Sequence, residues 1–259
     1  MCEHCGCGTA TEAAGHGGHS HPHPHAHAHP HTHDATDAAP PTPGESRRID
    51  VEQRILARNE ERAAQNRAWL AERGIVALNL ISAPGSGKTR LLEQTLERLR
   101  GRIPCAVLAG DVQTDRDARR LAGKGAHVHA IETGASCHLN AEQVGALLPH
   151  VCGDDTRLLF IENVGNLVCP AAFDLGESFK VALLATTEGE DKPIKYPALF
   201  SRAAVAIVNK TDLAGALDWD GAACRRFIRQ VHPGVFIFEL SAKTGEGLDR
   251  WLDYLEALV

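Results

Sequence analysis

The stretch Ala77-Leu-Asn-Leu-Ile-Ser-Ala-Pro-Gly-Ser-Gly-Lys-Thr89 decides the fold of this chain. The apolar run 75–81 is typical of a buried strand, and a turn with two glycines follows it. A Lys-Thr pair then opens the amphipathic segment 90–100, which predicts a helix. A strand, a glycine-rich turn and a helix in this order are typical of a phosphate-binding loop. The sequence therefore predicts an α/β domain that binds a nucleotide; a glycine-rich structural turn is the alternative.

This turn supplies groups that bind phosphate. Its backbone N–H groups, at the positive end of the new helix, would point at the β-phosphate. Lys88 would neutralise charge on the β- and γ-phosphates, and the Thr89 hydroxyl would ligate Mg²⁺. One residue departs from the usual pattern, because Ser82 stands where the first glycine is expected. The predicted nucleotide-binding residues here are Gly85, Ser86, Gly87, Lys88, Thr89 and Arg90, and Lys88 is also a predicted catalytic residue.

Composition limits the classes of function. The 259 residues suffice for a full α/β core with an enzymatic site. The formal charge of −6, with no basic face interleaved with aromatics, argues against a nucleic-acid partner. No apolar run is long enough to span a bilayer and no signal-like N-terminus is present, so a cytoplasmic location and no membrane partner are expected. In that compartment the eight cysteines indicate metal ligands or buried thiols rather than disulfides.

Three cysteines lie within six residues near the N-terminus: Cys2, Cys5 and Cys7. The glycines beside them allow a tight backbone, so the sequence predicts that the three thiols bind one metal ion. The terminal amine, His4 or a water would supply the fourth ligand. Such a set suits planar Ni²⁺ or tetrahedral Zn²⁺, and the residues leave both open. A tail with incidental thiols is the alternative.

A histidine-rich tract follows, with nine histidines in the range 16–33. It has no hydrophobic face to bury, so we expect a disordered segment that binds divalent ions loosely. An expression tag is the alternative, although tags are usually contiguous runs of histidine. The segment 34–46 has the composition of a linker. The predicted organisation is therefore a cysteine motif at 1–8, a histidine-rich segment and linker at 9–46, and a nucleotide-binding domain at 47–259.

The periodicity of the chain predicts the remaining elements of this domain. Strands are expected at 75–81, 103–109, 126–131, 157–161, 179–185, 203–208 and 235–240, and helices at 50–73, 90–100, 116–122 and 247–258. In the segment 186–197 two lysines lie between turn-forming prolines, which indicates an exposed basic loop near the phosphates or at a subunit interface.

Two aspartates follow the second of these strands. Asp111 lies at its carboxyl end, next to the predicted nucleotide, where a metal-binding or water-orienting group belongs. We assign Asp111 to Mg²⁺, through water, and Asp115 to positioning the attacking water. Asp115 has an alternative role as the N-cap of the helix 116–122.

A second set of soft ligands lies farther along the chain. Cys137 and His138 are adjacent in a loop and form half of a predicted metal site. Glu162 and Gly165 follow a strand, where phosphate-loop proteins carry an acidic residue near Mg²⁺ and a glycine that contacts the γ-phosphate. Cys169 lies on the same loop, so a nucleotide that orders this loop would change the metal affinity. A small buried cysteine that only packs is the alternative for Cys169.

The strongest signal for specificity is Asn209-Lys-Thr-Asp212. The Asp212 carboxylate would accept the ring N–H and the exocyclic amine of guanine, Asn209 would address the other edge, and the Lys210 stem would pack on the base. The segment Ser241-Ala-Lys243 would form a second base loop, in which the Ala242 N–H donates to the guanine oxygen. The predicted base-binding residues are Asn209, Lys210, Asp212, Ser241, Ala242 and Lys243.

With these motifs in place the chain resembles the HypB family, the GTP-hydrolysing nickel-insertion proteins of [NiFe]-hydrogenase. The residues that carry the resemblance span 75–243 in the family order: Ser82–Thr89, Gly110–Asp115, Glu132–Gly134 with Cys137 and His138, Glu162–Asn166, Asp191–Pro197 and Asn209–Asp212. The cluster Cys2, Cys5 and Cys7 matches a high-affinity nickel motif of some members.

The resemblance implies fold, cofactors and partners. The fold would be a doubly wound, mostly parallel sheet of the SIMIBI type of P-loop GTPase, with GTP, Mg²⁺, Ni²⁺ and Zn²⁺ as ligands. Cys137, His138 and Cys169 would form a second metal site near the interface of a GTP-dependent homodimer. The implied partners are a HypA-type nickel metallochaperone, the hydrogenase large subunit and a metal-binding prolyl isomerase.

Three functions compete on this evidence. The first is a metal-delivery switch in which the nucleotide state changes metal affinity. Its turnover would be slow, because no arginine finger can be assigned, although Lys192 or Lys195 of a neighbouring subunit would serve. The second is nickel storage by the N-terminal segment. The third is a related GTPase that serves urease or a cobalamin enzyme.

Overall fold

The computed structural model describes residues 43–111, 116–133 and 137–259, with side chains from Gln53 onward except that of Asp111. The predictions for Cys2, Cys5, Cys7, the histidine-rich tract and Asp115 lie outside these residues. The chain divides into two units after Glu52, and the second unit, 53–259, carries the sheet and the site.

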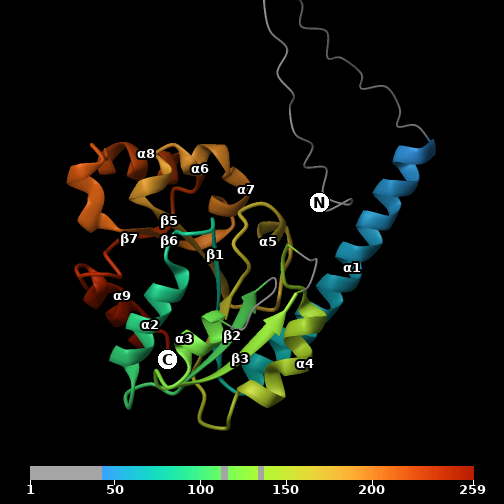
Figure 1. Ribbon diagram of the computed structural model, residues 1–259. Coiled ribbons are helices and arrows are strands. Elements are labelled where there is room, and N and C mark those ends of the chain that lie inside the picture. The colour runs from blue at the N-terminus through green and yellow to red at the C-terminus, as the bar shows by residue number, and fades with distance from the viewer. Residues whose placement is uncertain (1–42, 112–115, 134–136) are drawn as a thin grey trace, which may run out of the picture. The chain divides into compact units, whose positions relative to one another are not determined.

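A parallel sheet forms the centre of this unit (Figure 1). Within the described residues it has seven strands, in the order β3-β2-β4-β1-β5-β6-β7, and every neighbouring pair is parallel. The strands are β1 Val76–Ser82, β2 Cys105–Asp111, β3 Ala126–Glu132, β4 Leu158–Glu162, β5 Phe179–Ala185, β6 Ala203–Asn209 and β7 Phe236–Glu239. The carboxyl ends of β2, β4 and β1 therefore lie side by side.

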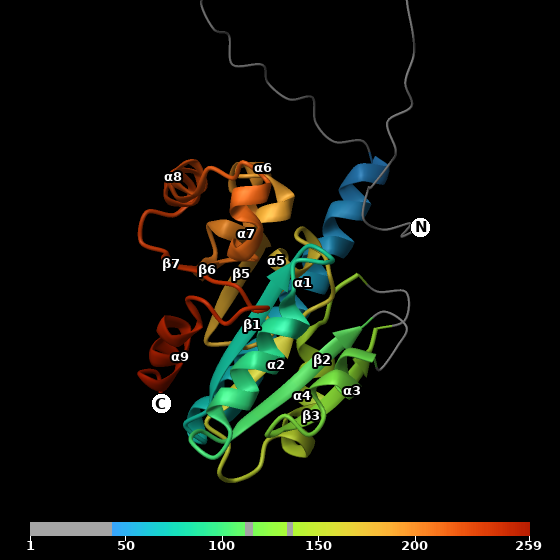
Figure 2. The same cartoon turned by 60° about the vertical axis from the view of Figure 1, so that its left-hand side comes forward.

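Helices cover both faces of the sheet (Figure 2). On one face α2 Lys88–Leu99, α3 Arg116–Leu121 and α9 Leu248–Glu256 pack on the strands. The other face is covered by the part of α1 (Pro43–Glu72) from Gln53 onward, and by α4 Ala141–Val151, α5 Cys169–Ala172, α7 Pro197–Phe200 and α8 Gly221–Val231. The short helix α6 Lys192–Lys195 and the 3-10 turns Thr186–Glu188 and Thr211–Ala216 complete the connections. None of these helices combines the length and apolarity that a membrane span requires.

The alternation of β1 explains why it occupies the middle of the sheet. Leu78 and Leu80 pack into the core under α2, whereas Ala77 and Ile81 pack on the opposite face. Both sets are fully buried, as expected of a parallel strand covered by helices on both sides. The doubly wound parallel fold inferred from the sequence is confirmed.

Helix α1, beyond Gln53, is held to the domain by buried asparagines rather than by an apolar stripe alone. The Asn66 amide donates to the carbonyls of Ala141 (2.7 Å) and Leu175 (2.9 Å). Asn59 donates to the carbonyl of Asp174 (2.7 Å) and accepts from the N–H of Ala141 (2.9 Å). These side chains are only 6–8% exposed, so their hydrogen bonds fix the position of this part of α1 against the first residue of α4 and the loop that follows α5.

All seven strand predictions are confirmed to within two residues, and two other predictions need correction. Helix α1 begins at Pro43, so the predicted linker 34–46 extends too far. Helices α4 and α8 were not predicted. The segment 186–197, predicted as an exposed basic loop, contains α6 and the start of α7, because its prolines stand in the first turns of helices. Its lysines are ion-paired: Lys192 with Glu188 (3.3 Å) and Lys195 with Asp191 (2.6 Å).

Candidate functional site

A cavity of about 430 Å³ opens at the carboxyl ends of β1, β2 and β4. Its wall combines the glycine-rich turn with the ends of the neighbouring strands and one face of α3. The lining residues are Pro84, Gly85, Ser86, Gly87, Lys88, Thr89, Arg90, Gly110, Asp117, Arg120, Glu162, Asn163, Val164 and Gly165. The structure thus brings together the predicted phosphate-binding residues and the segment that begins at Glu162, which lies more than seventy residues later in the sequence.

The glycine-rich turn owes its geometry to Gly87, which caps α2. Its φ of 99° is unfavourable for any residue with a side chain. A Cβ at this position would lie 2.5 Å from Nδ2 of Asn209, so the space is also closed. Because α2 starts at Lys88, the free N–H groups of its first turn face the cavity, where an anion is stabilised.

Ser82 has a role that the usual glycine could not perform. Its hydroxyl accepts hydrogen bonds from Lys88 Nζ (2.9 Å) and from the Ser86 hydroxyl (2.5 Å), and it donates to the carbonyl of Ala83 (2.8 Å). Burial lowers the pKa of Lys88, so a close acceptor stabilises its ammonium group. The departure from the motif therefore places an oxygen that holds Lys88 at the floor of the cavity.

Glu162 lies opposite Thr89 and is 2% exposed. Its Oε1 accepts a hydrogen bond from the Thr89 hydroxyl (2.6 Å), whereas the buried Oε2 has no hydrogen-bond partner. Burial raises the pKa of this carboxyl to about 7, against the lowering effects of Thr89 and Lys88. An unpartnered buried carboxylate oxygen beside a threonine hydroxyl fits a hard cation such as Mg²⁺. Asp111 is the last residue of β2, as predicted, but the structure describes only its backbone.

Helix α3 contributes two cavity residues that sequence reasoning missed, Asp117 and Arg120. The guanidinium of Arg120 donates two hydrogen bonds of 3.1 Å to the carboxylate of Glu93, which is 7% exposed and also accepts from Arg90 (3.1 Å). This fork fixes Arg120 beside the phosphate-binding turn. The i, i+3 spacing of Asp117 and Arg120 on a helix that follows β2 could have indicated a pair of charged residues near the site. That Glu93 is the partner of Arg120 is not apparent from the sequence.

The two predicted base loops meet at Asn209. Its Nδ2 donates to the carbonyl of Ser86 (2.8 Å), and its Oδ1 accepts from the N–H of Ala242 (3.0 Å). Asn209 is 2% exposed, so it joins the phosphate-binding turn to the second base loop. This arrangement differs from the sequence interpretation, in which Asn209 and the Ala242 N–H both address the base. The Ala242 bond to a guanine oxygen stays a prediction and requires this N–H to change partners.

Asp212 and Ser241, from the two predicted base loops, lie within hydrogen-bond distance of each other. The Ser241 hydroxyl donates to Oδ1 of Asp212 (2.6 Å) and accepts from the N–H groups of Lys243 (3.3 Å) and Thr244 (3.1 Å). The Asp212 carboxylate has capacity for further donors, since it can accept about four hydrogen bonds. Lys210 adopts a φ of 62°, which turns the chain sharply between Asn209 and Asp212.

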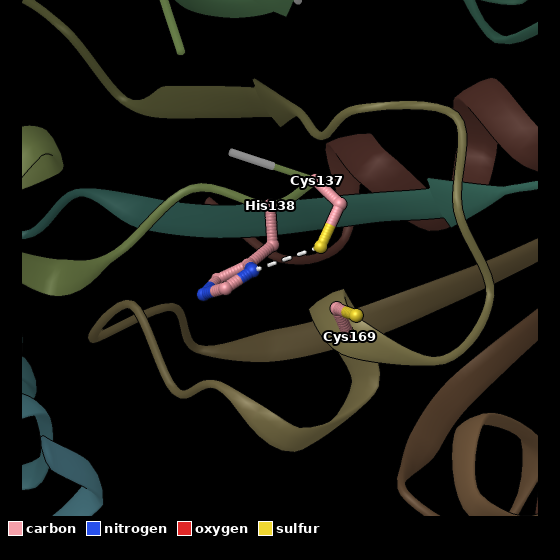
Figure 3. Close-up of side chains that lie close together, drawn as sticks. All are labelled: Cys137, His138 and Cys169. Carbon is pink, nitrogen blue, oxygen red and sulfur yellow. Dashed lines mark hydrogen bonds between the residues drawn. The ribbon is translucent and has the colours of Figure 1, made fainter. Parts of the chain in front are cut away.

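Cys137, His138 and Cys169 form a cluster whose ligand atoms all lie within 4.8 Å of one another (Figure 3). The Cys137 Sγ and His138 Nδ1 atoms are 3.6 Å apart. The His138 ring packs on Phe173 at 3.9 Å between centroids, and burial lowers the pKa of this imidazole. The neutral ring that results is the form that binds a metal. Cys169 is the first residue of α5, so the predicted ligands come from two separate segments.

Comparisons with known proteins agree with this geometry. Residues 76–239 match the family model described as the CobW/HypB/UreG nucleotide-binding domain. The hydrogenase maturation factor HypB of Azotobacter chroococcum is 50% identical over 212 residues, which cover 82% of this chain and 70% of that protein. The chain belongs to the HypB family. The resemblance inferred from the sequence is therefore confirmed.

Solved structures of HypB proteins have the same fold. The HypB structure from Archaeoglobus fulgidus matches with a TM-score of 0.74 and 39% sequence identity. The match covers 78% of this chain and 99% of the Archaeoglobus fulgidus chain. The HypB structure from Helicobacter pylori, solved in complex with nickel, matches with a TM-score of 0.73 and 34% identity, over 77% of this chain and 94% of its own. Membership of the HypB family places the chain among the P-loop GTPases, in which a nucleotide site is expected at the position of the cavity at β1.

Proposed function

We propose that this protein is a GTP-hydrolysing nickel metallochaperone that delivers nickel to [NiFe]-hydrogenase, with metal binding coupled to the nucleotide state. One observation carries the proposal. The segment 162–169 belongs to both sites, because its first four residues line the nucleotide cavity and its last residue, Cys169, belongs to the thiol-imidazole cluster. The names of the HypB relatives and the nickel in the Helicobacter pylori protein support the choice of ion and of pathway.

Different cavity residues would bind different parts of GTP and its Mg²⁺ ion. The N–H groups of the turn and Lys88 would hold the phosphates, and Gly165 would contact the γ-phosphate. Thr89 and Glu162 would hold Mg²⁺, with Asp111 as a further ligand through water. The cation supplies neutralisation of the charge on the β- and γ-phosphates. Guanine selection by Asp212 and water positioning by Asp115 remain predictions.

The cluster has a donor set that suits the cargo. A metal with sulfur at about 2.3 Å and nitrogen at about 2.1 Å in a tetrahedral arrangement separates these atoms by about 3.6 Å. Cys137 Sγ and His138 Nδ1 have this separation, so the spacing of this pair suits tetrahedral Zn²⁺. For planar Ni²⁺ the distance between these sulfur and nitrogen atoms must shorten by about 0.5 Å. Two thiols and an imidazole are ligands of a softness that suits this ion. We propose Ni²⁺ as the delivered ion and Zn²⁺ as a competitor for the same ligands.

The proposal includes an assembly. The chain would form a GTP-dependent homodimer in the cytoplasm and would exchange nickel with a HypA-type metallochaperone and the hydrogenase large subunit, with a metal-binding prolyl isomerase as a further partner. The segment 1–46 would store or buffer nickel, with Cys2, Cys5 and Cys7 as the tight site.

A pair of variants tests delivery against storage. Cells that depend on this protein for hydrogenase activity should lose that activity with Cys137→Ala and keep it with deletion of residues 1–45, when nickel is scarce. Cys152→Ala is the matched control, since Cys152 is a half-buried thiol outside the cluster. If the deletion abolishes activity and Cys137→Ala does not, the protein works through storage. If urease rather than hydrogenase activity is lost, the pathway is wrong.

A further inference from the structure

Asn166 occupies an unusual place between the two halves of the thiol-imidazole cluster. Its Nδ2 donates to the carbonyl of Cys137 (3.4 Å), and its Oδ1 accepts from the N–H of Val168 (2.9 Å), the residue before Cys169. One amide group therefore bonds the backbone of both ligand-bearing segments. The distance between these segments depends on the position of this side chain.

Asn166 also follows Gly165 directly, and Gly165 packs on the phosphate-binding turn. A Cβ on Gly165 would lie 3.1 Å from Cγ of Pro84, and both residues line the nucleotide cavity. Because the two positions are adjacent in the chain, a shift of the Gly165 backbone toward or away from a phosphate displaces the Asn166 amide. The bond to Cys137 is longer than the usual 2.7–3.2 Å, so a small displacement makes or breaks it.

The start of the same segment is anchored by Asn163. Its Nδ2 donates to Oδ1 of Asn79 on β1 (3.1 Å), and its Oδ1 accepts from the N–H groups of Val164 (3.0 Å) and Leu139 (3.3 Å). Asn163 is 1% exposed and its backbone N–H donates to Leu80 (3.1 Å). These bonds fix the residue after His138 to the centre of the sheet. Movement is therefore confined to the part of the segment beyond Asn163.

We propose that Asn166 is a positioning residue that carries the nucleotide state to the metal cluster, with Asn163 as the fixed point. The inference rests on the proposed function and adds the residue through which the coupling acts. In one nucleotide state the amide holds Cys137 and Cys169 at ligand spacing; in the other the bond to Cys137 is lost and the spacing relaxes. Groups outside the first coordination sphere that orient ligands commonly change metal affinity by about 10–100-fold.

The test compares nickel affinities in two nucleotide states. Nickel is titrated, against a competing chelator, into the full chain carrying Cys2→Ala, Cys5→Ala and Cys7→Ala, and the thiolate-to-nickel absorption band is recorded. This band reports thiolate ligands, so nickel on the histidine tract does not contribute. Each titration is made with GDP and with a non-hydrolysable GTP analogue, and the ratio of the two nickel dissociation constants is the readout.

Three substitutions are compared in this background. Asn166→Ala removes both hydrogen bonds, whereas Asn166→Asp keeps the acceptor for Val168 and removes only the donor to Cys137. Thr156→Val is the matched control, because it removes a side-chain acceptor of a backbone N–H (2.9 Å, from Gly153) before the amino end of β4, away from both sites.

The unsubstituted background should show a ratio of about fivefold or more, the usual range of coupling between sites. Both Asn166 variants should bring the ratio to within about twofold of one, with affinity for the GTP analogue changed by no more than about threefold, and Thr156→Val should keep the ratio. If Asn166→Ala keeps the same ratio of nickel dissociation constants as the background protein, the inference is overturned. This holds even if the substitution weakens nickel binding equally in both nucleotide states. A full ratio in Asn166→Asp alone overturns the assignment to the Cys137 bond. A ratio of one in the background protein itself refutes the proposed coupling, and the inference with it.

Discussion

Replacing Glu162 by glutamine should stabilise the nucleotide-free protein and weaken its binding of Mg²⁺ and GTP. The carboxylate is 2% exposed, and burial raises its pKa from 4.5 to about 7. Glutamine has nearly the same shape and keeps an oxygen for the Thr89 hydroxyl, but it has no charge to bury. The substitution therefore separates the charge of this residue from its packing.

The sign and size of the effect follow from the two pKa values. The folded protein holds the Glu162 proton more tightly than the unfolded chain, so this carboxyl gives stability below pH 4.5 that is lost as the pH rises through about 7. At about 1.4 kcal/mol for each pH unit between the two values, the full loss is about 3 kcal/mol. An unpaired buried amide costs about 1 kcal/mol, so at pH 8 the glutamine variant should gain about 2 kcal/mol.

The assay is urea unfolding in EDTA without nucleotide, at pH 5 and pH 8. The wild-type protein should lose about 2 kcal/mol more stability than Glu162→Gln between these two conditions, because all other titrating groups are shared. Glu142→Gln is the control, since the Glu142 side chain is 59% exposed. Equal pH dependence of the wild type and Glu162→Gln would refute the argument. In Mg²⁺-dependent GTP binding the variant should be weaker by about tenfold or more.

Three further substitutions test other parts of the structure. Asp212→Asn should weaken GTP and strengthen xanthosine triphosphate by about 2–4 kcal/mol each, because the amide presents a donor where the carboxylate accepts; unchanged nucleotide competition would contradict the base assignment. Asn209→Ala leaves the buried carbonyl of Ser86 and the N–H of Ala242 without their partner. It should therefore lower the unfolding free energy, measured by urea unfolding, and the free energy of GTP binding, measured by calorimetry, by about 2–4 kcal/mol each. Asn66→Ala should lower the unfolding free energy by about 2–3 kcal/mol with GTP affinity unchanged, and a loss below about 0.5 kcal/mol would remove its role in docking α1.

The strands were predictable because each is a short apolar run between turn residues, as expected in a sheet with helices on both faces. The helices were harder. Pro193 and Pro197 favour a turn in the sequence, but proline is also favoured in the first turn of a helix, where Pro193 lies in α6 and Pro197 lies in α7. Helix α8 was not predicted, although its sequence has helical spacing of apolar residues: Cys224 and Ile228, four positions apart, are both buried.

The candidate site was predictable where its residues are contiguous. The glycine-rich turn and Asn209–Asp212 are motifs in which the chain itself places the chemical groups together. Pairs brought together by the fold were not: Glu93 with Arg120, and Asn163 with Asn79. Amide side chains with no charge and no motif carry no signal about their partners until the strands are placed side by side.

The energies at the two ends of segment 162–169 are large enough for coupling. In the nucleotide-free state the Glu162 carboxylate lowers stability by about 3 kcal/mol above pH 7, because burial disfavours its charged form. A cation that binds beside it would recover much of this energy. A difference of about 1–3 kcal/mol between states changes the affinity of a second site by about 5–150-fold. The recovery at Glu162 is therefore comparable with the free-energy difference that coupling between two sites requires, while the movement itself is confined to the part of the segment beyond Asn163.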